Sequence, residues 1–402
     1  MMRVVVDCRI EPGRFGGIEQ AMRGLVSGLA RTDDEHVDVR VLSWQGMDAW
    51  AHASAEDASH VNIESIPPPT SRGLVRQVRS HAIGRRLLDY TQDLRSRHRG
   101  VPRSDGVIES LEPDVVHFPH QGAALTSAQS IYEPWDLQHV HLPELFTMAE
   151  YLRRERWYRA FCEQAAQVVV HSSSVRRDVI ERYGIDAGRV RVLPMGSALE
   201  LVGELDRHAS TRRRHELGAP PRYALYPAQS WPHKNHRRLL EAVAQLRSAG
   251  CVVPVVLAGA TNAMSELDAV ARDLGVRDLV YLPGRVSDLD LRALYDGATC
   301  LVYPSRHEGF GLPLVEAFGA AVPVVCSSID TLREVAGEAA EFVDPLDTEA
   351  IAAGIRRVWT DADRADELVS LGAARRTHFT WEATGAAYRS LYAAATVPEL
   401  VR

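Results

Sequence analysis

HEGFGLPLVEAFGAAVPVVCS, residues 307–327, decides the fold of the second half of the chain. An apolar run typical of a buried strand, CLVYP (300–304), comes directly before it. Gly309 and Gly311 allow a tight loop, and the pattern then predicts a helix over Leu312–Gly319. A strand, a glycine loop and a helix in this order are typical of a doubly wound α/β domain, whose ligands bind beyond the carboxyl ends of its strands.

The start of the predicted helix is suited to binding an anion, because unpaired N–H groups and the positive end of the helix dipole lie there. Glu316 lies about one turn into the helix, and a carboxylate at that place suits a ribose diol better than a phosphate. Glu308, on the loop, could similarly hold sugar hydroxyls. Either glutamate alone would be interpreted as a surface residue or a salt-bridge partner. Together with the glycine loop, the two favour a site for a sugar diphosphate.

WPHKNH, residues 231–236, contains the only lysine among the 46 Lys and Arg residues. A strand is predicted at 223–229 and a helix at Asn235–Ser248, which places Lys234 at a helix start beyond a strand end. Lysine is a compact point charge, whereas arginine is a broad planar fork. The lysine could be a chance survivor of an Arg-rich composition, but its place favours a role in holding the charge of a leaving diphosphate. A side chain at such a turn is expected to bury little surface.

Apolar runs alternate with helical patterns along all 402 residues, which indicates two parallel α/β domains. In the first half we predict a helix from Gly17 to about Ala30 and strands at Arg3–Arg9, Val37–Ser43, Asp114–Phe118, Gln167–His171 and Val190–Leu193. In the second half we predict further helices at Met264–Leu274 and Ser287–Asp296, and strands at 251–259, Leu279–Leu282, Cys300–Tyr303 and Pro323–Cys326. The polar stretch 195–221, which ends in Pro-Pro, is expected to connect the halves.

Composition excludes several classes of protein. The formal net charge of −7 argues against general nucleic-acid binding. The five cysteines are scattered and form no CxxC pair, which is typical of reduced core residues in a cytosolic protein. We expect no signal peptide and no membrane span, because MMRVVVDCRI leads directly into a strand pattern and no apolar run approaches about 18 residues. A cytoplasmic location is therefore predicted.

Residues 72–98 are basic and have a helical pattern, with Arg72, Arg76 and Arg79 on one side. An ordinary pair of surface helices would explain the pattern. The alternative is a cationic face for an anionic acceptor or for peripheral contact with the inner membrane face.

Several motifs resemble family-4 retaining glycosyltransferases of the GT-B fold, and together they cover nearly the full chain. They are Glu308-x7-Glu316 in HEGFGLPLVEA, the PHKN turn, the Gly16-Gly17-Ile18-Glu19 loop, WDLQHVHLPELF (135–146) and FTWEATGAAYRSLY (379–392). The resemblance implies two Rossmann-like, doubly wound α/β domains that face each other across a cleft. Residues 1–205, joined by a C-terminal helix at about 384–402, would bind the acceptor, and residues 206–383 would bind the nucleotide sugar.

The resemblance also implies roles for individual residues. The candidates for catalysis are Lys234, Glu308, His139 and Asp136. The nucleotide sugar would be bound by residues of both halves: Gly16, Gly17, Val286, Gly309, Phe310, Gly311, Leu312 and Glu316. In this scheme Lys234 holds the diphosphate, Glu308 contacts the donor sugar and Glu316 contacts the ribose. The backbone around Arg285 and Val286 would lie near the base.

Members of the family transfer a sugar from a nucleotide-diphosphate sugar with retention at the anomeric carbon, and need no bound metal or other cofactor. WDLQH-type sequences lean towards GDP-mannose-like donors, and the acceptor would be a saccharide, a lipid-linked sugar or a small molecule. SDLDL (287–291) could be mistaken for a metal-binding motif, but we interpret Ser287 and Asp288 as the start of a helix. No oligomeric state is predicted.

Two positions depart from the family pattern. Gln229 stands where many members have an arginine, and Trp135 stands where similar bacterial sequences have a histidine that is counted as catalytic. The second departure leaves open a catalytically impaired protein that binds sugar nucleotides. A GT-B sugar-nucleotide epimerase, which would release its product without an acceptor, is the other alternative to a transferase.

Overall fold

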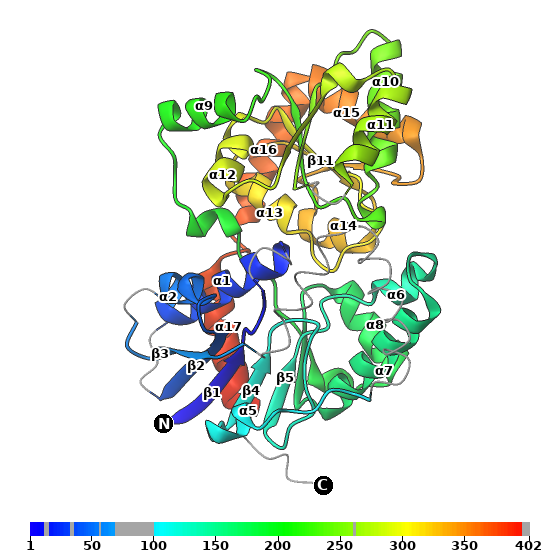
Figure 1. The fold of residues 1–402 in the computed structure, drawn as a ribbon. Helices are drawn as coiled ribbons and strands as arrows, with labels where there is room; N and C mark the ends of the chain where they lie inside the picture. Colours follow the sequence, from blue (N-terminus) through cyan, green and yellow to red (C-terminus); the bar gives the residue numbers. More distant parts are fainter. Residues whose placement is uncertain (12–15, 33–35, 56–57, 69–99, 260–262, 396–402) are drawn as a thin grey trace. The chain divides into compact units, whose positions relative to one another are not determined.

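The structure is a computed structural model of the chain, and it describes all residues except 12–15, 33–35, 56–57, 69–99, 260–262 and 396–402 (Figure 1). The predicted basic segment 72–98 therefore lies outside the described residues. Contacts divide the chain into a first unit, Met1–Leu193 with Trp381–Arg402, and a second unit, Pro194–Thr380.

The first unit contains a parallel sheet of seven strands in the order β3-β2-β1-β4-β5-β6-β7. Its strands are β1 (Met2–Asp7), β2 (Val37–Trp44), β3 (Val61–Ile66), β4 (Val115–Phe118), β5 (Gln129–Tyr132), β6 (Gln167–Val170) and β7 (Val190–Val192). From β1 the chain first adds β2 and β3 on one side, and then crosses over to add β4 to β7 on the other side of β1. The carboxyl ends of β1 and β4 are therefore where a doubly wound domain binds its ligands.

Helices cover both faces of this sheet, which explains why its strands are nearly continuous apolar runs (Figure 1). They are α1 (Gly17–Arg31), α2 (Ala49–Ala55), α5 (Val107–Ser110), α6 (Gln138–His141), α7 (Met148–Gln164), α8 (Ser173–Tyr183) and α17 (Trp381–Ala395). Val4 and Val6 belong to a core that includes α1 and α17, and Val5 belongs to a second core that includes α7 and α8. Successive strand side chains point to opposite faces, so one strand contributes to both cores.

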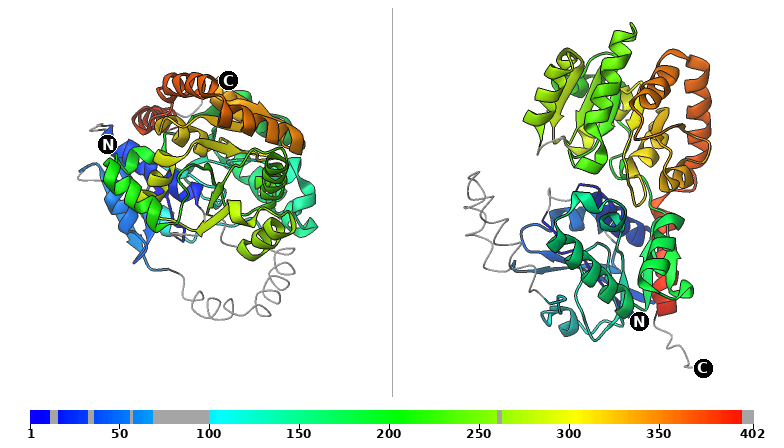
Figure 2. Two further views of the ribbon diagram at one scale, coloured as in Figure 1. Left: turned by 90° about the horizontal axis from the view of Figure 1, so that it is seen from above. Right: turned by 90° about the vertical axis from the view of Figure 1, so that its right-hand side faces the viewer.

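The second unit contains a parallel sheet of six strands in the order β10-β9-β8-β11-β12-β13, with helices on both sides (Figure 2). Its strands are β8 (Ala224–Pro227), β9 (Val255–Ala258), β10 (Val280–Gly284), β11 (Cys300–Tyr303), β12 (Val324–Ser327) and β13 (Glu341–Val343). Its helices are α9 (Arg207–Glu216), α10 (His236–Ser248), α11 (Met264–Asp273), α12 (Asp288–Gly297), α13 (Leu312–Gly319), α14 (Asp330–Ala336), α15 (Thr348–Thr360) and α16 (Ala362–Arg376). The order reverses between β8 and β11, so the WPHKNH turn and the glycine loop leave adjacent strands at the same edge.

The predicted pair of parallel α/β domains is confirmed, but both halves were incompletely predicted. In the second half no element was predicted for α14, β13, α15 or α16. β3, β5, α2, α7 and α8 were missed, because their apolar runs are short or their exposed faces are rich in arginine. The expectation that 195–221 is only a connection is wrong, since α9 lies within it. Arg213 of α9 binds Asp290 at 2.7 Å and Ser210 binds Asp296 at 3.2 Å. A helix that is held by polar contacts, such as α9, has no apolar stripe, so apolar periodicity does not predict it.

The C-terminal helix α17 packs closely on α1, within the first unit. Neither Gly24 nor Gly28 has room for a Cβ atom, because the Trp381 indole lies against the first and the Trp381 carbonyl oxygen lies against the second. Arg389 adds polar contacts from α17, donating to the Thr32 hydroxyl at 2.6 Å and to the Leu29 carbonyl at 2.7 Å. The glycines of α1 therefore serve close helix packing rather than flexibility.

Gly28→Ala is expected to destabilise the first unit by about 1–3 kcal/mol, because the added methyl overlaps the α17 backbone. Thermal unfolding of the full chain would measure this. Gly319→Ala is the matched control, since a Cβ there meets Ser197 Oγ at an ordinary 3.6 Å. The close-packing argument fails if the two variants unfold at the same temperature, or if Gly28→Ala is stabilised as expected for an unhindered helix position.

Candidate functional site

The Lys234 ammonium lies at the centre of a polar cluster at the carboxyl edge of the second unit's sheet. Its Nζ donates to Glu308 Oε1 at 2.7 Å and to the Tyr303 hydroxyl at 3.0 Å. The side chains of Lys234 and Glu308 are only 15% and 11% exposed. The expectation that this lysine buries little surface is therefore wrong. The sequence placed it at a turn, but the turn folds against the end of β11 rather than into solvent.

Glu308 is a buried carboxylate whose charge depends on Lys234. Burial would raise its pKa, but the ammonium of Lys234, with further contributions from His233 and Ser305, lowers the pKa below the ordinary range. Glu308 is therefore an anion at neutral pH. The predicted grouping of Lys234 with Glu308 is observed, and the two are paired directly with each other.

The WPHKNH turn is fixed by Asn235, which has a left-handed backbone conformation with φ 65°. Asparagine tolerates this conformation better than most residues. Its side-chain amide donates to the carbonyl oxygens of Pro304, at 3.0 Å, and Pro345, at 2.7 Å. The Tyr226 hydroxyl donates to the Lys234 carbonyl oxygen. These bonds join the turn to the loop after β11 and hold the Lys234 backbone in one place.

The predicted loop and helix at 307–319 are confirmed, with α13 beginning at Leu312 after Gly311. Gly311 has a φ of 109°, and a Cβ there would lie 2.6 Å from Leu332 Cδ2, so both backbone and space require glycine. Phe310 and Leu312 are buried and anchor the loop to the core. Pro313 lies in the first turn and has no N–H, so the backbone donors at this helix start come from its neighbours.

Glu316 is 2% exposed and differs from Glu308 in its protonation. Its Oε2 accepts a hydrogen bond from the Tyr295 hydroxyl at 2.7 Å. Burial, together with the charge of Asp288, raises the pKa of Glu316 to about 7, although the Tyr295 bond acts in the opposite direction. The two glutamates of the motif therefore titrate in different ranges, because only one of them has a cation beside it.

The loop after β10 carries Val286, which is half-buried, and follows Gly284 with φ 73°. Ser287 caps α12, accepting from the Asp290 N–H at 3.2 Å, so the interpretation of this segment as a helix start is confirmed. Asp290 is paired with Arg213. In the part of the chain that the structure describes, no cluster of three His, Cys, Asp or Glu side chains has the geometry of a metal site.

The remaining predicted residues lie in the first unit. Gly16, with φ 50°, and Gly17 lie at the start of α1, next to the undescribed residues 12–15. Asp136 is half-buried and accepts from the Gln138 N–H at 3.1 Å. His139 is fully buried, and its Nε2 lies 3.2 Å from Glu155 Oε1. Burial lowers the pKa of His139 to about 4, so the ring is neutral near pH 7.

A buried carboxylate that was not among the predicted site residues, Glu133, directly follows β5. Its Oε1 lies 2.7 Å from His117 Nε2 and accepts from the Tyr388 hydroxyl of α17, and its Oε2 lies 3.2 Å from His171 Nε2. Burial would raise its pKa, but the hydrogen bonds from His117 and His171 hold the pKa well below its ordinary range. His171 Nδ1 lies 2.8 Å from the Leu193 carbonyl oxygen, so both ring nitrogens of His171 have a partner that holds the ring in place.

Trp135, the departure from the family pattern, lies beside this network. It has a φ of 67°, which is strained for a bulky residue. Its indole N–H donates to the Pro119 carbonyl at 3.1 Å, and its ring packs edge-on against His171 at 5.4 Å. The Glu133 network could have been predicted from the sequence, because Glu133 stands two residues before the WDLQH motif and His117 and His171 lie at the ends of two strands.

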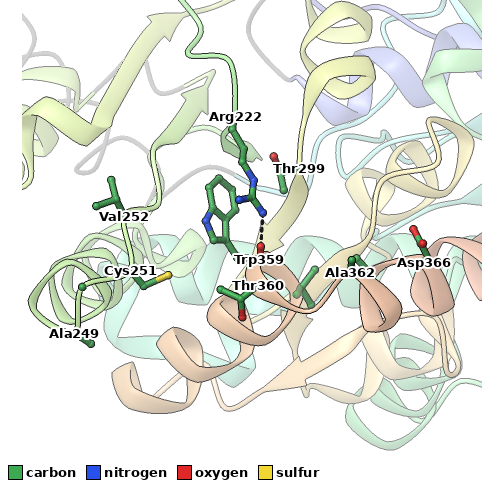
Figure 3. A pocket seen from close by; sticks show the side chains of 12 residues that line it. Arg222, Ala249, Cys251, Val252, Thr299, Trp359, Thr360, Ala362 and Asp366 are labelled. Atoms are coloured by element: carbon green, nitrogen blue, oxygen red, sulfur yellow. Dashed lines mark hydrogen bonds between the residues drawn. The ribbon is translucent and has the colours of Figure 1, made fainter.

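A cavity of about 670 Å³ lies at the opposite, amino edge of the second unit's sheet (Figure 3). Its lining includes Arg222, two residues before β8, and Thr299, directly before β11. The Arg222 guanidinium stacks on the Trp359 ring, 4.2 Å from its centroid. This cavity is remote from Lys234 and Glu308, because the two edges of a parallel sheet are at opposite ends of its strands.

Comparisons with known proteins agree with this geometry. The family description "Glycosyl transferases group 1" matches residues 209–375, and "Glycosyltransferase Family 4" matches residues 15–201. A D-inositol 3-phosphate glycosyltransferase from Xylanimonas cellulosilytica is 30% identical over 322 residues, which are 74% of this chain and 76% of that protein. The chain belongs to glycosyltransferase family 4.

Other relatives of this family 4 glycosyltransferase are mannosyltransferases. O-antigen chain mannosyltransferase B from Escherichia coli is 31% identical over 252 residues, 60% of this chain. The chain spans 66% of the length of that protein, and 59% and 57% of two further mannosyltransferases. The crystal structure of HepE from Anabaena, solved with UDP and glucose, matches 98% of this chain and all of that one, with a TM-score of 0.70 and 17% identity. The fold is therefore GT-B.

The described residues of this glycosyltransferase include no helix that is both long and apolar enough to cross a bilayer.

The Glu133 network predicts a large cost for Glu133→Gln. Removing one partner of a buried charge pair costs about 3–5 kcal/mol, and thermal unfolding would measure it. The pKa of Glu133 is lowered on folding, so its contribution is complete above its ordinary pKa of 4.5 and is lost as the pH falls below that value. The difference between wild type and variant should therefore be larger at pH 7 than at pH 4.

Glu112→Gln is the control, because that side chain is 87% exposed and its variant should stay within about 0.5 kcal/mol of wild type. Equal unfolding temperatures for the two variants would contradict a charged, stabilising Glu133.

Proposed function

We propose that this family 4 glycosyltransferase transfers a sugar from a nucleotide-diphosphate sugar with retention at the anomeric carbon, and that it needs no metal or other cofactor. The observation that carries the proposal is the Lys234 ammonium, held with Glu308 at the sheet edge where the glycine loop and α13 begin. The mannosyltransferase relatives favour a GDP-mannose-like donor. A saccharide, lipid-linked sugar or small molecule would be the acceptor, and the four fully buried cysteines support a cytoplasmic location.

The chemistry follows from where charge develops. When the bond from the anomeric carbon to the diphosphate oxygen breaks, the sugar gains positive character and the diphosphate gains negative charge. An ammonium about 4 Å from that charge contributes on the order of 4 kcal/mol per unit charge at an effective dielectric near 20, before desolvation. Stabilisation that grows along the reaction lowers the barrier, so Lys234 would act mainly on turnover.

The other residues have complementary roles in this proposal. Glu316 would accept hydrogen bonds from the ribose diol, Glu308 would contact the donor sugar, and the N–H groups of Gly309 to Leu312 would hold the diphosphate. Gly16 and Gly17 of the first unit would contribute to the same ligand, with the base near Val286. We propose a positioning role for His139, because the side chain is buried against Glu155, and a role for Asp136 at the acceptor.

Incubation with a panel of GDP, UDP, dTDP and ADP sugars tests the function and the metal independence together. Slow release of nucleoside diphosphate without acceptor, unaffected by EDTA, is expected of the transferase. An altered sugar on an intact donor would instead support the epimerase, and binding without turnover would support the catalytically impaired protein. Complete loss of activity with EDTA, restored by Mg²⁺, would contradict metal independence.

Glu316 should make nucleotide-sugar binding dependent on pH. Its raised pKa of about 7 means that it is largely protonated at pH 6 and ionised at pH 8, and the ionised form accepts both diol hydrogen bonds. Affinity for a UDP or GDP sugar should therefore increase from pH 6 to pH 8 in calorimetry. Glu316→Gln should bind weakly with a flat pH profile, whereas Glu308→Gln should keep the profile and lose turnover. An unchanged affinity in Glu316→Gln would remove the ribose assignment.

Lys234→Ala should lower kcat by at least about 100-fold, which corresponds to about 2.7 kcal/mol of transition-state stabilisation. Because it also leaves a buried carboxylate without its cation, it should destabilise the second unit by several kcal/mol. In Lys234→Ala combined with Glu308→Gln the stability should recover, which would show that the destabilisation comes from the unpaired carboxylate. Wild-type kcat in Lys234→Ala, measured below its unfolding temperature, would contradict the proposed role.

A further inference from the structure

Tyr303 contacts the Lys234 ammonium, which also binds Glu308, although no motif singles this tyrosine out. It is the last residue of β11 and is 1% exposed. Its hydroxyl accepts from Lys234 Nζ at 3.0 Å, and the same ammonium donates to Glu308 Oε1 at 2.7 Å. The ammonium lies 5.3 Å from the centroid of its ring, within range of a cation–π interaction. One phenol thus contacts the cation with its oxygen and with its ring.

A second tyrosine fixes the other end of the lysine. Tyr226 packs edge-on against Tyr303, with ring centroids 5.6 Å apart, and its hydroxyl donates to the Lys234 carbonyl. The lysine is therefore held at its backbone by one tyrosine and at its ammonium by the other. A flexible four-carbon stem that would normally sample many rotamers is confined to one geometry.

We propose that Tyr303 is a positioning residue that directs the Lys234 ammonium. Two N–H groups of the ammonium donate to Tyr303 and Glu308, and the third is presented to a single diphosphate oxygen of the donor. The two hydrogen bonds that the ammonium makes among the described residues account for two donors, and an ammonium has three. The proposal rests on the proposed function for the identity of the ligand, but the contact between Tyr303 and Lys234 can be tested without it.

The same geometry explains why the only lysine of the chain is found here. A guanidinium is planar and carries five donors in a fixed fork, so it would need acceptors across its whole width. Tyr303 and Glu308 offer a narrow buried gap that suits a point charge. An arginine in this gap would displace the phenol or leave buried donors without partners, which is costly.

The single lysine permits a direct experiment. Protein labelled with ¹³C at the lysine ε-carbon gives one side-chain NMR signal, and a held ammonium makes the two ε-protons inequivalent and ring-shifted. In Tyr303→Phe, which keeps the ring and removes the hydroxyl, the two ε-proton signals should merge. In wild type, added UDP-glucose or GDP-mannose should shift the signal. Tyr223→Phe is the control, because that buried hydroxyl donates to the Leu294 carbonyl and not to the site.

Kinetic measurements provide a second test of whether Tyr303 positions Lys234. Tyr303→Phe should lower kcat about tenfold and change the KM for the donor by less than about threefold. In a Lys234→Arg background the same substitution should lower kcat by less than about twofold, because the ammonium that Tyr303 positions is absent there. A structural role would instead lower activity equally in both backgrounds and would appear in Tyr223→Phe as well. Inequivalent ε-protons that persist in Tyr303→Phe, or an equal loss of kcat in both backgrounds, would overturn the proposal. If no sugar nucleotide is turned over, the proposed function fails, and the NMR signal alone still decides whether Tyr303 holds Lys234.

Discussion

The site of the second unit depends on the buried ion pair between Lys234 and Glu308. A buried carboxylate stays charged only if a cation compensates its lost hydration, and Lys234 does so at 2.7 Å. The surrounding bonds serve to keep this pair aligned. Asn235 adopts the left-handed conformation that turns the chain, Tyr226 holds the lysine carbonyl, and Tyr303 contacts the ammonium. Such a pair adds little to stability by itself, because the lost hydration of both ions offsets their attraction, although removing one partner is costly.

The two glutamates of one motif show how environment sets the protonation of identical side chains. Glu308 and Glu316 are both buried, yet the pKa of the first is lowered and that of the second is raised to about 7. The difference follows from their partners, an ammonium for Glu308 and a neutral phenol, Tyr295, for Glu316. An ionised carboxylate beside a cation is suited to orienting that cation and to stabilising its charge. A buried carboxylate with a pKa near 7 is ionised more readily when a ligand supplies hydrogen-bond donors, as a diol does.

The sequence predicted this site better than it predicted the first unit, for physical reasons. Gly311 and Lys234 lie on loops that follow strongly apolar strands, so their place at a sheet edge follows from strand order alone. The direct bond between Lys234 and Glu308 could not be predicted, since it depends on how two loops from different strands close on each other. In the first unit, α7 was missed because its exposed arginines obscure the helical period. Tyr388 could not be assigned to Glu133, because 255 residues of chain separate them.

Trp135 stands where the family resemblance implies a histidine, and its surroundings explain how a bulky residue is held in a strained conformation. A strained backbone costs about 1–3 kcal/mol and persists only when neighbouring contacts hold it. Here the indole N–H bond to Pro119 and the packing on His171 do so, and His171 is itself fixed by Glu133. Glu133 also binds Tyr388 of α17, so the segment that contains Trp135 is linked to the C-terminal helix. The same charge network stabilises the fold, and a network with that role can hold a bulky residue in a backbone conformation that it would not adopt alone.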